Sequence, residues 1–454
     1  MGVEVGGNFG DLLEDLESFV FEVDSAEADG LELAQDAGDF AGFATEAPLA
    51  GEACTDPVGQ KADAHMVDDA FGLAMEDGAD LEVALEFAKS FFDFEKVFVV
   101  ALELGANFSD RYRKVHADPV AVEDALLKLG VRCLPSDSEV LILDFDATDD
   151  PLHGNQEGRF FHGYYGNYCY LPLYCFCGSV PLWAQLRRSN ADASEGTVEA
   201  LQKIVAAIRE RLPSVKIVVR ADSGFSREEI MAWCEAQSDV FYLIGMARNP
   251  RLERLAGPAT LRAAASFCLT GVASRSYMET PYRTCKSWSR DRRMLCKAET
   301  LPGNKNNPRF VTTNIPAEGI FSKSGEVLLE GGVSWLYEKG YCGRGNAENM
   351  IKQMVLDLDA DRTSCSWMAA NQMRLWFSSF AYLILERVRT IGLAGSSLAQ
   401  ATLGGVRLRL LKVAALVKVS VRRVHVALCS AFPLQGIFRQ AAYRLERCAS
   451  PSPG

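Results

Sequence analysis

The stretch SEVLILDFDAT (Ser138–Thr148) decides the fold class of this chain. A continuous apolar run that ends in acidic and small residues predicts a strand buried on both faces of a sheet. Two further stretches predict buried strands of the same kind, Lys216–Ala221 (KIVVRA) and Phe241–Ala247. Asp222 opens the turn that follows Lys216–Ala221.

Helical patterns separate these predicted strands. The segment Ser194–Arg211 repeats apolar residues at the 3.6-residue period of a helix. Its apolar face comprises Leu201, Ile204, Val205 and Ile208. A second helix is predicted over Ser226–Ala236, with Ser226 as its N-cap and Glu229 completing a capping box.

A hairpin is predicted between the first strand and the first helix. Two aromatic and apolar runs, Asn167–Cys177 and Val180–Arg187, are separated by Gly178-Ser179, which is a turn signal. The resulting order is strand, strand, strand, helix, strand, helix, strand. This order predicts an α/β sheet with a hairpin meander before its helical crossovers.

The C-terminal half has a different texture. Residues 248–335 contain scattered basic residues and turn-forming Gly, Pro and Asn residues. This pattern predicts an inserted β-rich subdomain. Helices are predicted over Ala347–Leu358 and over the long apolar stretch Ser366–Val388. Val406–Leu410 and Val417–Val426 alternate Val or Leu with Arg or Lys, which predicts half-buried strands.

Composition places the chain among globular proteins. Of its 454 residues 48% are apolar and 24% are charged, and no run of 18 apolar residues is present. The N-terminus has no basic region before an apolar stretch, so no secretory signal is predicted. The thirteen cysteines are spread singly, which favours reduced thiols and a cytoplasmic protein without a membrane partner.

Charge is distributed unevenly along the chain. The formal net charge is −13, yet residues 1–110 hold 27 acidic side chains against three lysines. The remaining residues hold 33 acidic and 44 basic side chains. This asymmetry predicts an acidic N-terminal segment, poorly ordered or helical, on a basic body suited to a polyanion such as nucleic acid.

Acidic residues gather where the predicted strands end. Asp144, Asp146, Asp149 and Asp150 cluster at the exit of the first strand, and Asp222 follows Lys216–Ala221. Ligands bind at the carboxyl ends of strands in open α/β sheets, and carboxylate oxygens suit Mg²⁺ or Mn²⁺. The alternative is that these residues serve only as turn and cap residues.

A third candidate acid lies in a predicted helix. Tyr341, Arg344, Glu348 and Lys352 follow one another at spacings of three, four and four, which places them on one helical face. A carboxylate between two cations suits a metal ligand beside a phosphodiester. The alternative is a solvated helix face with an ordinary Glu–Lys pair.

Other candidates carry weaker signals. Cys175 and Cys177 share a strand face but lack a partner pair with zinc spacing, so packing is the favoured role. His153 and His162 flank a loop, which they order or through which they contact substrate. Trp288 lies where aromatic and basic residues alternate, so it is either a base-stacking residue or a core residue.

Three long motifs resemble the DDE transposases of bacterial insertion sequences, most closely the insertion-sequence family numbered thirteen-eighty. The motifs are LDFDATDDPLHGNQEGRFFHGYYGNYCYLPLYCFCG, RADSGFSREEIMAWCEA and YCGRGNAENMIKQMVLDLDADRTS. The likeness runs from about Arg111 to Arg447. It implies a ribonuclease-H-like mixed sheet with flanking helices and a β-rich insertion before the last acidic helix.

The resemblance also implies roles for individual residues. Asp146, Asp222 and Glu348 match the three catalytic, metal-holding acids, which implies two Mg²⁺ or Mn²⁺ ions. Tyr341 and Arg344 match the YxxRxxxE signature and imply contacts to DNA phosphates. That signature has a lysine seven residues after the glutamate, where this chain has valine, and Lys352 is the nearest basic substitute.

The chain is thus interpreted as a transposase that cleaves double-stranded DNA and transfers strands at the ends of a mobile element. We expect a homo-oligomer on DNA and, for a bacterial protein, a location at the nucleoid. Two alternatives are an inactive remnant that only binds DNA and another ribonuclease-H-like nuclease. The expected regions are an acidic segment (1–110), the first part of the catalytic core (111–247), the insertion (248–335), the last part of the core (336–390) and a basic C-terminal segment (391–454).

Overall fold

The computed structural model describes residues 118–303, 305–419 and 424–449. The predicted acidic segment, residues 1–110, lies outside the described residues. The chain divides into two compact units, of which the larger runs to Val406 and the smaller includes the residues from Arg407 onward. Within the described residues no helix has both the length and the apolar character needed to cross a membrane.

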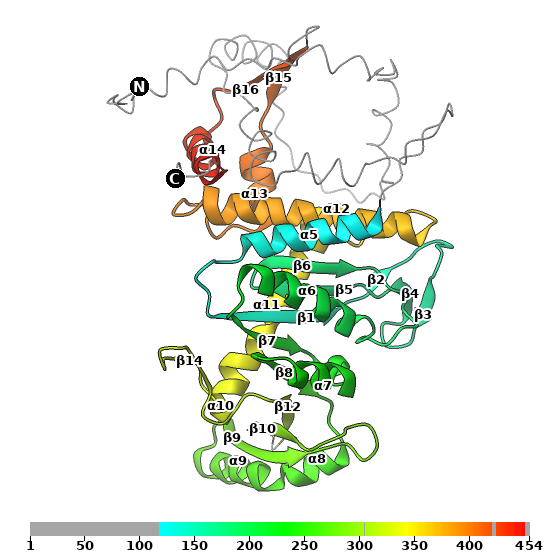
Figure 1. Cartoon of the computed structure of the whole chain (residues 1–454), viewed down its shortest axis with the longest axis vertical. Coiled ribbons are helices and arrows are strands. Elements are labelled where there is room, and N and C mark those ends of the chain that lie inside the picture. The colour runs from blue at the N-terminus through cyan, green and yellow to red at the C-terminus, as the bar shows by residue number, and fades with distance from the viewer. Residues whose placement is uncertain (1–117, 304, 420–423, 450–454) are drawn as a thin grey trace, which may run out of the picture. The chain divides into compact units, whose positions relative to one another are not determined.

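A nine-stranded mixed sheet forms the centre of the larger unit (Figure 1). Its order is β11-β10-β12-β8-β7-β1-β5-β6, and β9 pairs with β10. β1 is parallel to β7, and β7 to β8, whereas the other pairings are antiparallel. The central strands are β1 (Val140–Ala147), β5 (Leu173–Cys177), β6 (Val180–Gln185), β7 (Lys216–Ala221) and β8 (Val240–Met246). These strands agree with the sequence predictions, including the β5–β6 hairpin.

Helices α6 (Thr197–Arg211) and α7 (Glu228–Ala236) connect β6 to β7 and β7 to β8. The predicted apolar face of α6 is buried. The capping box predicted for α7 is wrong, because Arg227 is the N-cap and the helix begins two residues later than predicted. The Ser226 hydroxyl lies 3.1 Å from the Met246 sulfur instead, so a contact with β8 replaces the local cap.

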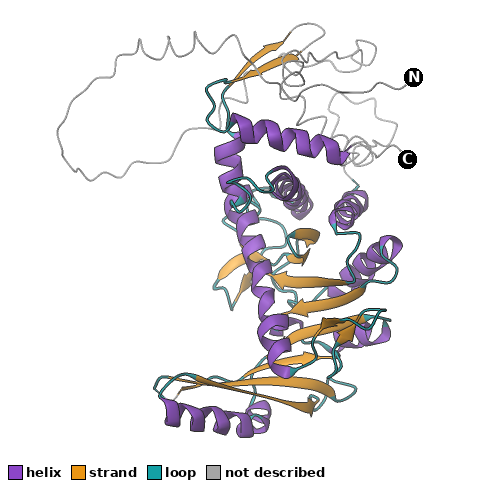
Figure 2. Ribbon diagram, turned by 90° about the vertical axis from the view of Figure 1, so that its left-hand side faces the viewer, coloured by secondary structure: helices purple, strands orange, loops and turns teal. Residues whose placement is uncertain are grey.

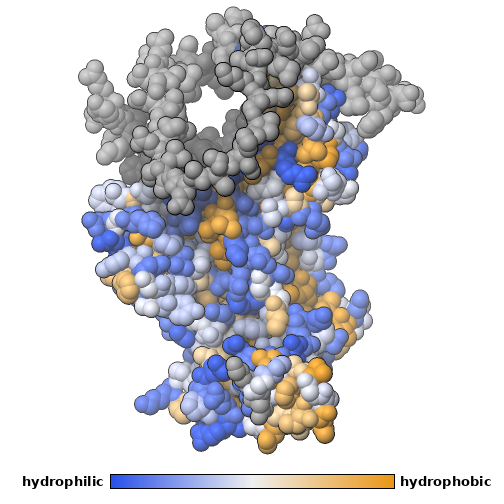
Figure 3. Space-filling view, turned by 180° about the vertical axis from the view of Figure 1, so that it is seen from behind, coloured by the Kyte–Doolittle hydropathy of each residue, from blue (hydrophilic) through white to orange (hydrophobic). Residues whose placement is uncertain are grey.

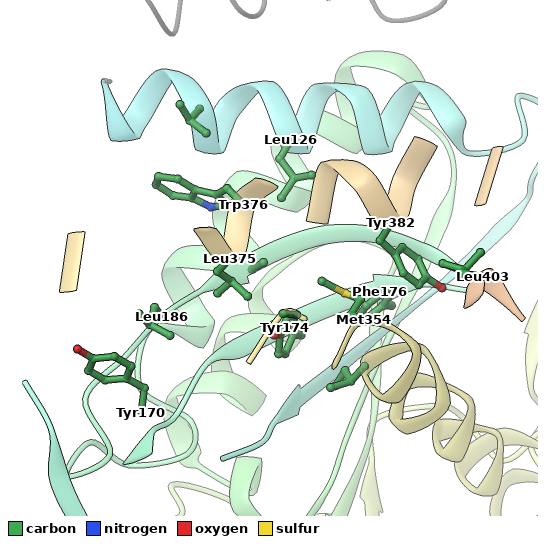
Figure 4. Packing of buried hydrophobic residues seen from close by; sticks show 14 of the residues in the cluster. Leu126, Tyr170, Tyr174, Phe176, Leu186, Met354, Leu375, Trp376, Tyr382 and Leu403 are labelled. Atoms are coloured by element: carbon green, nitrogen blue, oxygen red, sulfur yellow. The ribbon is translucent and has the colours of Figure 1, made fainter. Parts of the chain in front are cut away.

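Three helices share a hydrophobic core with β5 and β6. They are α5 (Pro119–Cys133), α11 (Gly345–Leu358) and α12 (Met368–Arg387). Asp118 caps α5 by accepting a hydrogen bond from the Val120 amide, and Pro119 starts the helix. Figure 4 shows the shared core, in which Tyr174 and Phe176 of β5 face Met354 and Tyr382. Figure 2 shows helices on both sides of the strands.

The segment between β8 and α11 differs from the predicted β-rich subdomain. It begins with two helices, α8 (Pro250–Leu255) and α9 (Gly257–Thr270). Only Ala259 and Ala263 are fully buried on α9, so its apolar period is too weak to read from the sequence. The later strands extend the main sheet, since β12 pairs with β8. The remaining elements are β9 (Ser274–Tyr282), β10 (Arg292–Leu301), β11 (Lys305–Asn306), β12 (Arg309–Thr313), β13 (Ile320–Phe321), β14 (Val327–Leu329) and α10 (Val333–Trp335).

Apolar side chains reach the surface at the α9 end of the larger unit. Leu269 on α9 is 87% exposed, and Val272 just beyond the helix is exposed as well. Figure 3 shows apolar residues gathered at this lower end of the molecule.

A small three-stranded sheet, in the order β2-β4-β3, lies beside the main sheet (Figure 1). Its strands are β2 (Asp150–Pro151), β3 (Phe160–His162) and β4 (Asn167–Tyr170). The run Asn167–Cys177, predicted as one strand, therefore divides into β4 and β5. The break falls at Leu171-Pro172, where proline cannot donate a hydrogen bond to a sheet.

The strand predicted at Val406–Leu410 is wrong. This stretch is helical, with α13 (Leu403–Val406) followed by a π-helical turn over Arg407–Leu411. Leu403, Val406 and Leu410 are buried, and their spacing of three and four is that of a helix. In the smaller unit β15 (Ala415–Val419) and β16 (Val424–Leu428) form a hairpin, and α14 (Gln435–Ala449) follows.

Candidate active site

Two of the predicted acids lie where the central strands β1 and β7 end. We call this end of the sheet, with Asp146, Asp222 and Glu348, the acidic edge. Phe145 of β1 is paired with Ala221 of β7 in a parallel ladder, so Asp146 and Asp222, the next residue on each chain segment, lie side by side. Asp146 accepts a hydrogen bond from the Ala147 amide at 3.0 Å. Asp222 accepts one from the Gly224 amide at 2.7 Å and caps the turn that follows β7. Strand ends and turn geometry therefore fix both carboxylates.

Arg344 connects the third acid to this edge. Its guanidinium lies 3.4 Å from Asp146 Oδ2 and 2.7 Å from Glu348 Oε1. Glu348 stands one turn into α11 with its side chain 56% exposed, whereas the Asp146 side chain is 14% exposed. One arginine thus joins two acids that are far apart in the sequence, and Asp222 lies beside the first of them.

The acids act on one another electrostatically. Burial, with smaller contributions from the carboxylates of Asp222 and Glu348, raises the pKa of Asp146 to about 6 against the lowering effect of Arg344. Burial alone would lower the pKa of Arg344, but Asp146 and Glu348 hold it above its ordinary value. The edge of the sheet therefore carries more negative charge than one guanidinium offsets.

The helical run expected over the four-residue signature is irregular. Leu336–Tyr341 is π-helical, Cys342–Arg344 is a 3₁₀ turn, and α11 begins only at Gly345. The Arg344–Glu348 pair keeps its helical spacing, while the Tyr341 hydroxyl reaches Gly245 of β8. A Cβ on Gly245 would collide with that hydroxyl, so this glycine makes room for the tyrosine. Irregular helical turns of this kind are frequent at functional sites.

A buried ion pair between Arg220 and Asp144 lies beneath this turn, and the sequence did not predict it. Arg220 donates to both carboxylate oxygens of Asp144 at 2.7 Å, and to the Gly340 carbonyl at 2.7 Å. Gly343 packs so closely that a Cβ there would lie 2.5 Å from the guanidinium. Asp144 is therefore a structural partner of Arg220 and no part of the acidic edge. The signal in the sequence was one charged residue in each apolar strand, two positions before Asp146 and Asp222.

Asp149 and Asp150 brace the small sheet. Asp149 accepts a hydrogen bond from Asn167 at 3.2 Å, and Thr363 lies 3.3 Å from Asp150. Burial, followed by the nearby Asp361 carboxylate, raises the pKa of Asp150 to about 8. Both residues therefore act as turn and packing residues, which is the alternative that the sequence left open for this acidic cluster.

The base-stacking role predicted for Trp288 is wrong for the structure described. The ring is only 6% exposed and packs edge-on against Tyr282, with centroids 5.7 Å apart. The Arg292 guanidinium covers it at 5.3 Å. Trp288 is therefore a core residue, which was the alternative.

The remaining candidates are placed as follows. Lys352 is exposed on α11, and among the described residues it makes no ion pair with Glu348. Cys175 and Cys177 are buried in β5, as expected of packing residues. His153 is exposed in the loop after β2, and the His162 ring lies 4.8 Å from that of Tyr165.

The donor chemistry at the acidic edge fits a divalent cation. Asp146, Asp222 and Glu348 offer only carboxylate oxygens, which are the ligands that a hard divalent cation prefers. Burial and, to a lesser degree, the neighbouring carboxylates raise the pKa of Asp146, and a bound cation would favour its charged form. The described residues contain no ready-made cluster of three His, Cys, Asp or Glu side chains around a metal position. Arg344 lies between Asp146 and Glu348, so these two acids can share a cation only if the guanidinium turns away.

Comparison with known proteins identifies the family. Residues 109–450 match the family described as Transposase DDE domain group 1, so the chain belongs to that family. No curated protein matches the sequence. Among solved structures, the piggyBac transposase in a synaptic complex with hairpin DNA is similar with a TM-score of 0.37 and 10% identity. The likeness covers 71% of this chain and 78% of that one, and at this TM-score it carries no argument about function.

Proposed function

We propose that this protein is a DDE transposase that cleaves double-stranded DNA and joins the cut strands at the ends of an insertion sequence. Asp146, Asp222 and Glu348 are the catalytic acids of this proposal. The general part of the proposal, that the protein is a DDE transposase, rests on its membership of that family. The proposed closer relationship, to the insertion-sequence family numbered thirteen-eighty, rests on the three sequence motifs alone.

One observation carries the assignment of the acids. Arg344 contacts both Asp146 at the end of β1 and Glu348 in α11, beside Asp222 at the end of β7. Turn and cap residues on separate elements have no reason to share one guanidinium. Carboxylates gathered at the carboxyl ends of strands can hold the cations that phosphodiester chemistry requires, once the guanidinium turns away.

The strand order supports a ribonuclease-H-like core. Three consecutive strands, β6, β5 and β1, are joined in antiparallel ladders, and the two crossover strands β7 and β8 continue from β1 in parallel. The segment between β8 and α11 would be the insertion that precedes the acidic helix. In such a core the first and fourth strands carry two of the acids, which are Asp146 and Asp222 here.

Each residue has a distinct proposed role. Asp146, Asp222 and Glu348 would hold two divalent cations, whose chemistry would be activation of the attacking water or 3′-hydroxyl and stabilisation of the leaving oxygen. Arg344 balances the acids in the conformation described and would turn to the phosphate when DNA arrives. Tyr341, fixed against Gly245, would position the DNA strand, and the exposed Lys352 would contact a neighbouring phosphate.

The partner of this site would be double-stranded DNA. The residues after the acidic segment carry 44 basic against 33 acidic side chains, which suits phosphate contacts. Binding by such contacts should weaken steeply as salt is added. We also propose a homo-oligomer, because cutting both ends of an element requires two active sites.

A nicking assay on the element's end DNA tests the function. The full chain with Mg²⁺ should cut the duplex, and Asp146→Asn, Asp222→Asn and Glu348→Gln should each abolish cutting while DNA binding persists. Glu338→Gln is the matched control, since Glu338 lies ten residues before Glu348 and contacts Arg275 and Tyr277 instead. Cutting by the Glu348→Gln protein, or loss of cutting in the control alone, would contradict the assignment.

A further inference from the structure

The small sheet beside the acids exposes an unusual number of aromatic rings. We call residues 160–170, which comprise β3, its turn and β4, the aromatic hairpin. Tyr164 is 87% exposed, Phe161 58% and Tyr168 47%. Single exposed apolar residues are ordinary on a protein surface, but a group of rings on one short hairpin marks an interaction site.

The rings are held in fixed positions. Phe161 and Tyr168 are direct cross-strand partners, and their rings meet edge-on with centroids 5.6 Å apart. The Arg159 guanidinium lies 4.7 Å from the centroid of the Tyr168 ring. The two rings are nearly perpendicular, and the guanidinium covers one face of Tyr168. Exposed rings beside a guanidinium suit a nucleotide, because a free ring face can stack on the base while the cation meets the phosphate.

The hairpin also extends toward the acidic edge. The Tyr164 ring lies 5.0 Å from that of Tyr165, which in turn lies 4.8 Å from His162. Next to the turn of the hairpin, Asn167 donates to Asp149, three residues after Asp146. Burial, together with the carboxylates of Asp149, Asp146 and Asp222, raises the pKa of Tyr165 to about 12. The hydrogen bond from Asn167 to Asp149 therefore ties the turn that carries Tyr164 and Tyr165 to the segment just after Asp146.

We propose that the aromatic hairpin binds an unpaired base of the DNA strand next to the phosphate that is cut, with Tyr164 as the principal stacking residue. The inference rests on the proposed function, because it takes the acids as the cutting site. Paired bases expose only their edges, whereas an unpaired base offers a face to an aromatic ring. Stacking explains why rings rather than hydrogen-bonding side chains line this surface, and it predicts tolerance of base identity.

A fluorescence titration tests the proposal on the full chain. The probe is an end duplex that carries a short unpaired tail with 2-aminopurine at the first unpaired position, with Ca²⁺ in place of Mg²⁺ to prevent cutting. Wild-type protein should quench 2-aminopurine and bind the tailed duplex more tightly than the blunt one. Tyr164→Ala should lose the quenching and weaken tailed-duplex binding about 5- to 150-fold, the range for removal of one stacked base. Tyr164→Phe should retain both.

Controls separate stacking from general effects. Leu269→Ala removes an equally exposed apolar side chain on α9 and should change neither affinity nor quenching. Binding of the blunt duplex should be the same for Tyr164→Ala as for wild type. The exposure of Tyr164 means that its truncation should leave the melting temperature unchanged.

The possible failures are distinguishable. If wild-type protein binds blunt and tailed duplexes equally and Tyr164→Ala does not alter quenching, the stacking surface is refuted while the proposed function stands. If no duplex is bound at low salt, the proposed function fails and the inference with it. If Tyr164→Ala changes the sedimentation mass of the DNA-free protein and leaves DNA binding intact, the hairpin is an interface between copies of the chain, which also overturns the proposal.

Discussion

Replacing Asp146 with Asn should stabilise the protein while removing a proposed cation ligand. Burial and the neighbouring carboxylates raise the pKa of Asp146 from 3.8 to about 6, even with Arg344 beside it. The folded protein therefore holds this proton more tightly than the unfolded chain, and ionisation costs folding free energy as the pH rises through this range. At about 1.4 kcal/mol per pKa unit the cost is about 3 kcal/mol above pH 6. Asparagine carries no charge, so the variant avoids this free-energy cost.

Urea unfolding of the full chain in EDTA, from pH 4 to pH 8, measures this effect. Asp146→Asn should be more stable than wild type by about 3 kcal/mol at pH 7, and the gain should shrink below about 1 kcal/mol at pH 4. Asp192→Asn is a control of opposite sign. Burial alone would raise the pKa of Asp192, but hydrogen bonds from Arg227 and Ser194 hold it at about 2, so losing that charge should destabilise. A lower stability of Asp146→Asn at pH 7 would refute the reasoning, because the Arg344 pair would then outweigh burial.

Three further substitutions probe the surroundings of the acids. Arg344→Ala should weaken both DNA binding and cutting, measured by gel shift and nicking on the same duplex, whereas Glu348→Gln should affect cutting alone. Gly245→Ala should displace the Tyr341 hydroxyl and crowd the backbone of Asp222 and Ser223, so single-turnover cutting should slow by about 100-fold and the melting temperature should fall as well. Arg220→Met should lower the free energy of unfolding by about 3–5 kcal/mol in urea, because it leaves the Asp144 carboxylate buried without a partner, and the double substitution with Asp144→Leu should recover much of the loss.

The sequence predicts the parts of the fold that depend on local pattern. Strand β7 begins and ends at the predicted residues, and β1 lies within its predicted stretch, because both are continuous apolar runs. The same runs place Asp146 and Asp222 at strand ends. Their neighbourhood then depends on the parallel pairing of β1 with β7, which the structure shows and the order of elements along the chain leaves open.

Features set by distant contacts were beyond reach. Ser226 has the local pattern of a helix cap, yet its hydroxyl meets Met246 of the next strand. Trp288 stands among basic residues in the sequence, but Tyr282 and Arg292 enclose it in the fold. The exposed rings lie instead on the aromatic hairpin, and only the three-dimensional arrangement distinguishes them from buried aromatic residues.

The position of Glu348 is predictable from the sequence only in part. Its motif indicates an acid on a helix, but no local pattern predicts which strand end that helix approaches. The contact of Arg344 with Asp146 supplies this information. The π-helical turn before α11 is equally invisible in the sequence, because it depends on the packing of Tyr341 against Gly245 and of Gly343 against Arg220.

The most direct test of the central claim is to count the Mn²⁺ ions that bind to the protein–DNA complex, using electron paramagnetic resonance. If Asp146, Asp222 and Glu348 hold two cations, wild type and the Glu338→Gln control should bind two Mn²⁺ with the exchange coupling expected at roughly 3.5–4 Å. Glu348→Gln should lose the coupled signal while still binding DNA. A coupled pair that persists in Glu348→Gln, or no bound Mn²⁺ in the wild-type complex, would contradict the account.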